Sequence, residues 1–295
     1  MLAPTSVHYG MSYAQGAILG LVQGVSELFP ISSLGHSVVL PRLLGWQLDQ
    51  RDPSFVTFLV ATHTATAVVL FGFFWRDWMR MLHGVGRSFV ARRIAPENVH
   101  GKVGWLLIVG TVPAGLLGLL FQDPLQHLFA SARFAAAFLA LNGLLLYAAE
   151  RLRRRVPRVE TTAGSDQRLA RMHWWQSLMV GSVQALALIP GLSRSGSAMA
   201  GGLLVGLSNE DAARFAFLLA TPIIGAAGGL KLPTLLTPAN HAQLGPALVG
   251  AIGAGGTAYL AVKFLLRYFE TRRLTPFAVY CAAAGISLTL VFLVR

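Results

Sequence analysis

The chain alternates between long apolar segments and short polar ones. Six apolar runs are long enough to cross a bilayer, because a transmembrane helix needs about 20 such residues. They cover approximately 54–75, 103–121, 132–150, 211–231, 243–266 and 276–294. The pattern therefore predicts six full transmembrane helices.

Two further apolar regions, about 13–46 and 174–207, are interrupted near their middle by Pro, Gly, Ser and charged residues. Each region is long enough for two half-helices that meet at a polar turn. Non-helical backbone at membrane depth is tolerated only where protein or a water-filled cavity surrounds it. We therefore interpret both regions as re-entrant helical hairpins.

The charges of the connecting segments predict the orientation. Basic residues concentrate in segments 76–102, 151–173 and 267–275, which we interpret as loops, whereas segments 122–131 and 232–242 carry one charge between them. Cytoplasmic loops carry an excess of Lys and Arg, so the three basic segments are expected in the cytoplasm and both chain termini outside. The first hairpin then enters from outside and the second from the cytoplasm.

A weak internal repeat agrees with this opposite orientation. Segment 58–62 resembles 217–221, and the two interrupted regions align without a gap. The aligned pairs include Gly20 with Gly181, Gln23 with Gln184, Ser32 with Ser193, and Gly35 with Gly196. The sequence thus predicts an all-α polytopic membrane protein, one domain over 1–295. Its six full helices and two oppositely oriented hairpins form an inverted-topology repeat with halves of about 13–150 and 174–294, and the expected binding site lies between the two breaks.

Composition agrees with the membrane class. The chain is 54% hydrophobic and 12% charged, with a mean hydropathy of +0.58, whereas soluble proteins are about 25% charged. The net charge of +12 lies in short connecting segments, so we expect membrane lipids and no nucleic acid as partners. The single cysteine, Cys281, excludes an internal disulfide.

Arg194 and Glu27 are the ionisable residues deepest within the two interrupted regions. Ionisable groups inside a membrane usually mark function, although a structural salt bridge between the hairpins is an alternative interpretation. Guanidinium binds phosphate bidentately, and glycine lets backbone N–H groups approach an anion. The pattern favours an anionic ligand such as phosphate.

Hydroxyl, amide and imidazole groups flank these two charges. Ser33, Ser193 and Ser195 could each cap a half-helix or contact phosphate, and His36 could be a core residue or provide acid–base chemistry. Gln23 precedes Glu27 by four residues, which places both on one helix face. Other candidates are Ser32 as a phosphate contact, and Thr62 and His63 in the next span.

The segments Gln23–His36 and Pro190–Gly196 together resemble the bacterial undecaprenyl-pyrophosphate phosphatase family, also called BacA, and the resemblance extends over nearly the whole chain. It implies an enzyme of the bacterial inner membrane that removes the terminal phosphate of undecaprenyl pyrophosphate at the outer face, which recycles the lipid carrier of cell-wall polymers. It also implies a divalent cation, Mg²⁺ or Ca²⁺. A homodimer is compatible with the resemblance.

The resemblance also assigns residues. The first motif's carboxylate, serine and histidine fall on Glu27, Ser33 and His36, and the second motif's phosphate-binding group falls on Ser193, Arg194 and Ser195. The cation would rest on Glu27 and pyrophosphate oxygens. The chain departs from the family pattern at three positions. Gln23 stands where the family has Glu or Gln, so only one carboxylate is present, and Ala198 stands where a threonine is common. Leu34 replaces a usual small hydroxyl residue.

The expected reaction is metal-assisted hydrolysis of a lipid pyrophosphate. Arg194 and the serines of its motif would hold the phosphoryl oxygens, and His36 would act as general acid or base on Ser33 or on water. The sequence leaves open whether a phosphoserine forms or water attacks directly. It also leaves open a polyprenyl-phosphate flippase, because transporters share inverted repeats, and a structural subunit without chemistry.

Overall fold

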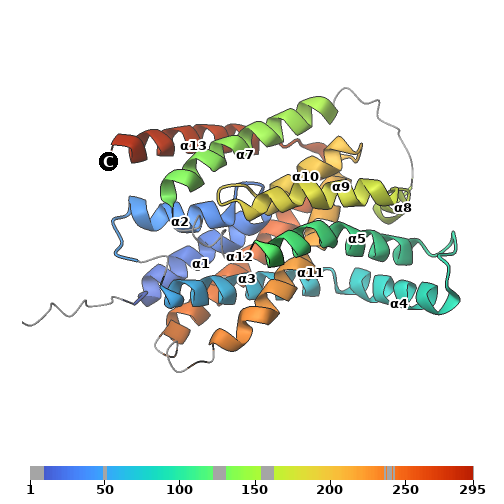
Figure 1. Cartoon of the computed structure of the whole chain (residues 1–295), viewed down its shortest axis with the longest axis horizontal. Helices are drawn as coiled ribbons and strands as arrows, with labels where there is room; N and C mark the ends of the chain where they lie inside the picture. The colour runs from blue at the N-terminus through green and yellow to red at the C-terminus, as the bar shows by residue number, and fades with distance from the viewer. Residues whose placement is uncertain are drawn as a thin grey trace, which may run out of the picture.

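The computed structural model describes residues 10–48, 52–121, 131–153, 163–235, 237, 241 and 243–294, and these form helices joined by turns (Figure 1). Six helices in these ranges are long and apolar enough to cross a membrane. They are α3 (Pro53–Phe73), α5 (Val99–Leu120), α7 (Ala132–Arg153), α11 (Asn209–Leu235), α12 (Leu244–Thr271) and α13 (Thr275–Val294). The six predicted spans are thereby confirmed, with ends that differ by a few residues.

The first interrupted region consists of two helices, α1 (Tyr13–Leu28) and α2 (Ser33–Leu43), which pack against each other. The backbone leaves the helical conformation at Phe29, and Ser32 caps α2 by accepting a bond of 3.2 Å from the N–H of Gly35. Ser32 has a φ of 70°, a left-handed conformation that is uncommon outside glycine. A strained capping turn therefore separates the two helices.

The second interrupted region has the same order of elements. Helix α9 (Trp174–Ala185) is followed by the 3₁₀ turn η1 (Leu186–Leu188) and then by α10 (Arg194–Leu204). Gly191 in the connecting turn has a φ of 98°, and a Cβ atom there would lie 2.4 Å from the carbonyl oxygen of Ala135. Only glycine fits this turn, because both its conformation and the contact with α7 exclude a side chain.

The two interrupted regions pack on different helices in a related way. Helix α1 lies along α12, whereas α9 lies along α5 (Figure 1). A Cβ atom on Gly20 would lie 2.2 Å from the carbonyl oxygen of Gly250, and one on Gly181 would lie 2.0 Å from that of Gly110. Small residues permit such close backbone approach between membrane helices, and these two glycines are an aligned pair of the sequence repeat.

The interpretation of segment 76–102 as a loop was wrong in part, because it contains helix α4 (Trp75–Ala91), which packs on α5. Its many basic residues obscured an apolar face that includes the buried Met81. Segment 151–173 likewise contains the short helix α8 (Ser165–Ala170). The predictions for loop residues 122–130 and 154–162, for residues 236, 238–240 and 242, and for both chain termini lie outside the described residues.

The three basic segments meet at one end of the helix bundle. Arg214 of α11 forms ion pairs with Asp166 at 2.9 Å and with Asp77 at 3.2 Å, which joins α8 and α4. At the same helix end, Glu150 accepts bonds from Asn209 at 3.0 Å and from the N–H of Leu274 at 3.1 Å. All three basic segments therefore lie around the first turns of α11. This is the arrangement expected of segments that face the same side of a membrane.

Candidate active site

The turns between α1 and α2 and between α9 and α10 are in direct contact. The hydroxyl of Ser195 donates to the carbonyl of Phe29 at 3.1 Å, and a Cβ atom on Gly35 would lie 3.4 Å from the Cα of Gly191. The two motifs that are widely separated in the sequence thus form a single site, as the sequence analysis predicts.

Glu27 is the centre of this site and is 5% exposed. Its Oε2 accepts a bond of 2.5 Å from the hydroxyl of Ser33 and one of 2.7 Å from the amide of Gln23, which confirms that Gln23 and Glu27 share a helix face. Its Oε1 accepts a bond from the guanidinium of Arg194. A buried carboxylate is costly unless it is paired and hydrogen-bonded, and these donors hold it in one orientation.

Arg194 is the first residue of α10, directly after the capping Ser193. Besides Glu27, its guanidinium donates to the carbonyl of Ala220 on α11 at 3.2 Å. The side chain is 18% exposed, whereas that of Glu27 is 3% exposed. A guanidinium has five N–H donors, and the bonds to Glu27 and Ala220 use one each, so the group can also hold an anion.

The serines of the second motif line the start of α10. Ser193 accepts a bond of 3.1 Å from the N–H of Gly196 and lies 3.1 Å from the hydroxyl of Ser195. Ser32 caps α2 in the same way. Of the three serines for which capping was the alternative interpretation, Ser193 caps a helix, whereas Ser33 donates to Glu27 and Ser195 to Phe29. The start of a helix carries positive partial charge and attracts anions, and two such helix starts meet here.

His36 is directed toward α13. Its Nδ1 lies 2.7 Å from the carbonyl oxygen of Ser32, and its Nε2 lies 2.8 Å from the hydroxyl of Tyr280. Because a carbonyl only accepts, Nδ1 carries a proton, and Nε2 is the ring nitrogen that exchanges a hydrogen bond with Tyr280. Any proton transfer by His36 would therefore involve Tyr280, a contact that the sequence did not reveal.

The imidazole next to Glu27 belongs to His63 of α3, which the sequence analysis treated only as a further candidate. Its Nε2 lies 3.3 Å from Oε2 of Glu27 and 3.2 Å from the amide nitrogen of Gln23. Its Nδ1 lies 2.7 Å from the carbonyl oxygen of Leu59. The neighbouring Thr62 is fully buried and donates to carbonyls of its own helix, so it does not contribute to the centre.

Sequence reasoning missed Asn142 of α7. This side chain is 0% exposed and hydrogen-bonds both motif turns, at Pro30 and at Ser193. The only indication in the sequence was that Asn142 is an amide among apolar residues in the middle of the predicted span 132–150.

The oxygen atoms around Glu27 are candidate ligands for the expected cation. No three His, Cys, Asp or Glu side chains form a metal-binding group within the described residues. One carboxylate, with the hydroxyl of Ser33 beside it, offers oxygen ligands of the kind that hard cations prefer, whereas the amide oxygen of Gln23 accepts from Ser37 and its nitrogen faces Glu27. The residues therefore fit a divalent cation only if phosphate oxygens complete its coordination.

Comparisons with known proteins give a consistent result. Residues 16–287 match the family described as "Bacitracin resistance protein BacA". The chain is 48% identical to "Undecaprenyl-diphosphatase" of Mycolicibacterium paratuberculosis, over 93% of this chain and 95% of the relative. It is 47% identical to the protein of the same name from Acidiphilium cryptum, over 93% and 96% of the two chains. It is 43% identical to "Undecaprenyl-diphosphatase 2" of Burkholderia ambifaria, over 91% and 92%.

Proposed function

This chain belongs to the BacA family, and we propose that it hydrolyses undecaprenyl pyrophosphate to undecaprenyl phosphate and inorganic phosphate. The observation that carries the proposal is the buried Glu27–Arg194 pair, which lies between two capped helix starts. Relatives named undecaprenyl-diphosphatase that match nearly the whole chain support the same reaction.

Arg194 binds the phosphoryl group and stabilises the negative charge that develops on its oxygens. The hydroxyls of Ser193 and Ser195, the hydroxyl of Ser32 and the backbone N–H groups at the two helix starts assist it. Such preorganised donors are effective because they need no rearrangement when charge develops. Their burial supports this role, since Ser193 is 2% and Ser195 is 3% exposed.

Ser33 and Glu27 are the groups that provide or activate the oxygen that attacks phosphorus. The 2.5 Å bond between them directs the serine proton toward the carboxylate. Ser33 can attack the terminal phosphorus while undecaprenyl phosphate leaves, which forms a phosphoserine that water then hydrolyses to inorganic phosphate. Alternatively, Ser33 can hold the water that attacks directly. His36, coupled to Tyr280, is the proposed general acid or base. His63 is a further candidate because it contacts Glu27 directly.

A divalent cation, Mg²⁺ or Ca²⁺, would be held by Glu27 and by phosphate oxygens of the substrate. When bound, it supplies charge neutralisation across the two phosphates. Arg194 already neutralises Glu27, which is why we assign most of the remaining ligands to the substrate.

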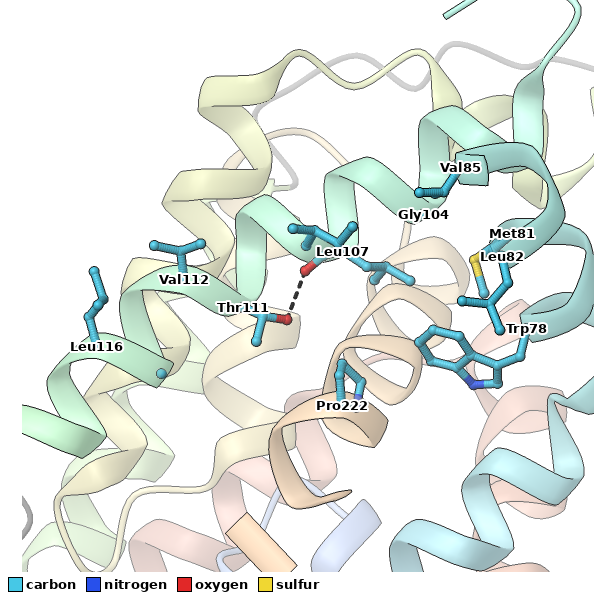
Figure 2. A pocket seen from close by; sticks show the side chains of 12 residues that line it. Trp78, Met81, Leu82, Val85, Gly104, Leu107, Thr111, Val112, Leu116 and Pro222 are labelled. Carbon is cyan, nitrogen blue, oxygen red and sulfur yellow. Dashed lines mark hydrogen bonds between the residues drawn. The ribbon is translucent and has the colours of Figure 1, made fainter. Parts of the chain in front are cut away.

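We place part of the isoprenoid tail of the substrate in a cavity of about 440 Å³ between α4, α5 and α11 (Figure 2). Figure 2 shows apolar side chains on its walls, among them Leu107 and Leu116 of α5. Pro222 also lines the cavity, two residues after Ala220, whose carbonyl accepts from Arg194. The cavity and the phosphate site thus both adjoin α11, which supports a tail that lies along this helix.

The protein is a multi-pass membrane protein, and we place it in the bacterial inner membrane with its site open to the exterior. The basic segments at one end of the bundle support a cytoplasmic location for that end. The exchanged packing of α1 on α12 and α9 on α5 supports the inverted repeat with two re-entrant hairpins.

Phosphate release from undecaprenyl pyrophosphate by the purified protein tests the function. Detergent micelles have no two separate compartments, so product formation there measures hydrolysis and not transport. We expect turnover that a chelator suppresses. Absence of phosphate release from folded protein with added Mg²⁺ or Ca²⁺ would refute the proposal.

A further inference from the structure

One buried amide connects the two turns of the active site. The Nδ2 of Asn142 donates to the carbonyl of Pro30 in the first turn at 2.9 Å, and its Oδ1 accepts from the N–H of Ser193 in the second turn at 3.0 Å. Its Nδ2 also lies 3.3 Å from the sulfur of Cys281 on α13. The residue comes from α7, which belongs to neither motif.

We propose that Asn142 is a positioning residue that fixes the separation of the two phosphate-binding turns; this inference rests on the proposed hydrolysis at that site. Pro30 follows Glu27 and Phe29 in the first turn, and Ser193 directly precedes Arg194 in the second. A change at Asn142 therefore alters how the arginine of one half faces the carboxylate and serine of the other.

The bonds of Asn142 are not duplicated by the caps of the same turns. Ser193 keeps its hydroxyl bond to the N–H of Gly196 without Asn142, so α10 still begins at the same residue. Loss of the amide instead leaves the backbone N–H of Ser193 without its partner, and it leaves the carbonyl of Pro30 with only the 3.7 Å contact to the sulfur of Cys281. The expected effect is a shift between two intact helix starts, and a shift of about 1 Å between catalytic groups can reduce the rate about 10²-fold.

Asn98 provides a matched control for a purely structural role. Its Nδ2 donates to the carbonyl of Gly84 at 2.7 Å, and its Oδ1 accepts from the N–H of Gly101 at 3.1 Å. It thus joins α4 to α5 through the same two kinds of bond, in a part of the protein without motif residues. Replacement of either asparagine by alanine removes one amide that bridges two backbone groups.

The experiment compares Asn142→Ala, Asn142→Asp and Asn98→Ala for kcat, KM and melting temperature in detergent. We expect both Asn142 variants to lose kcat about 10-fold to 10²-fold, with KM changed much less. The aspartate keeps an oxygen that accepts from the N–H of Ser193. It replaces the amide nitrogen with a second oxygen, which cannot donate to the carbonyl of Pro30 and repels it. Asn98→Ala should keep its kcat within about twofold at a comparable loss of melting temperature.

Two results would overturn the inference: wild-type kcat in both Asn142 variants, or an equal loss of kcat in Asn98→Ala. If Asn142→Ala does not fold, Asn142→Asp is judged by the same criterion. Stabilisation of each variant by inorganic pyrophosphate in a thermal-shift measurement gives a readout that does not depend on turnover. We expect weaker stabilisation in the Asn142 variants only. An inactive wild-type protein would instead refute the proposed function itself.

Discussion

The Glu27–Arg194 pair permits a test that separates catalysis from structural support. In Arg194→Ala, Glu27 keeps its bonds from Ser33 and Gln23 but loses its bond from the guanidinium. In the double variant Glu27→Gln/Arg194→Met both charges are absent, and the side chains remain similar in volume. The two variants therefore differ in whether an unpaired charge stays buried.

The two variants should differ in their free energy of unfolding. Removal of one partner of a buried ion pair costs about 3–5 kcal/mol, and the 18% exposure of Arg194 favours the lower end, about 3 kcal/mol. The double variant leaves no uncompensated charge, so it should regain most of that loss. Catalysis should not return, because each lost donor to a transition-state oxygen costs about 10²–10³-fold in kcat.

Thermal unfolding in detergent and phosphate release measured on the same samples check both expectations. We expect Arg194→Ala to be folded but less stable, and to lose about 10³-fold or more in turnover. The double variant should be near wild-type stability and equally inactive. If the double variant recovered turnover together with stability, the pair would be a structural salt bridge only, and the assignment of Arg194 to phosphate would be wrong.

Four further outcomes follow from the site. Ser33→Ala removes the 2.5 Å donor to Glu27 and should lower kcat about 10²-fold or more; turnover within twofold of wild type would leave direct attack by water. His36→Ala should reduce activity and change the pH profile of kcat, and an unchanged profile would exclude its acid–base role. Gly115→Trp should raise KM for the undecaprenyl substrate and not for farnesyl pyrophosphate, because Gly115 lines the cavity and has open space beside it; equal effects on both substrates would contradict the tail site. Excess EDTA should abolish phosphate release and Mg²⁺ or Ca²⁺ should restore it, whereas full activity in the chelator would exclude the cation.

The spans and breaks could be predicted from the sequence because membrane insertion depends on the length of apolar runs. The convergence of Glu27 and Arg194 was also predictable, since each lies in a polar interruption and the repeat relates the two interruptions. Helix α4 was not recognised as an element, because its basic residues resemble those of a loop.

The remaining site residues could not be predicted because they depend on helix packing. His63 and Asn142 reach the centre from α3 and α7, and neither lies in a motif. The internal repeat of the sequence also does not predict which hydrogen bonds the aligned side chains make. Gln184 aligns with Gln23 and is similarly buried, yet neither its amide nitrogen nor its oxygen has a hydrogen-bond partner among the described residues. A shared backbone arrangement thus carries different side-chain contacts in the two halves.

The contact of Gly20 with Gly250 has a consequence for biosynthesis. Helix α1 leaves the ribosome early, but the helix against which it packs follows about 230 residues later, a delay of roughly 10–50 s at a synthesis rate of 5–20 residues per second. During that interval α1 lacks α12, against which it packs in the finished protein. Glu27 is likewise synthesised 167 residues before Arg194, so its carboxylate lacks the guanidinium partner until the second motif has been made.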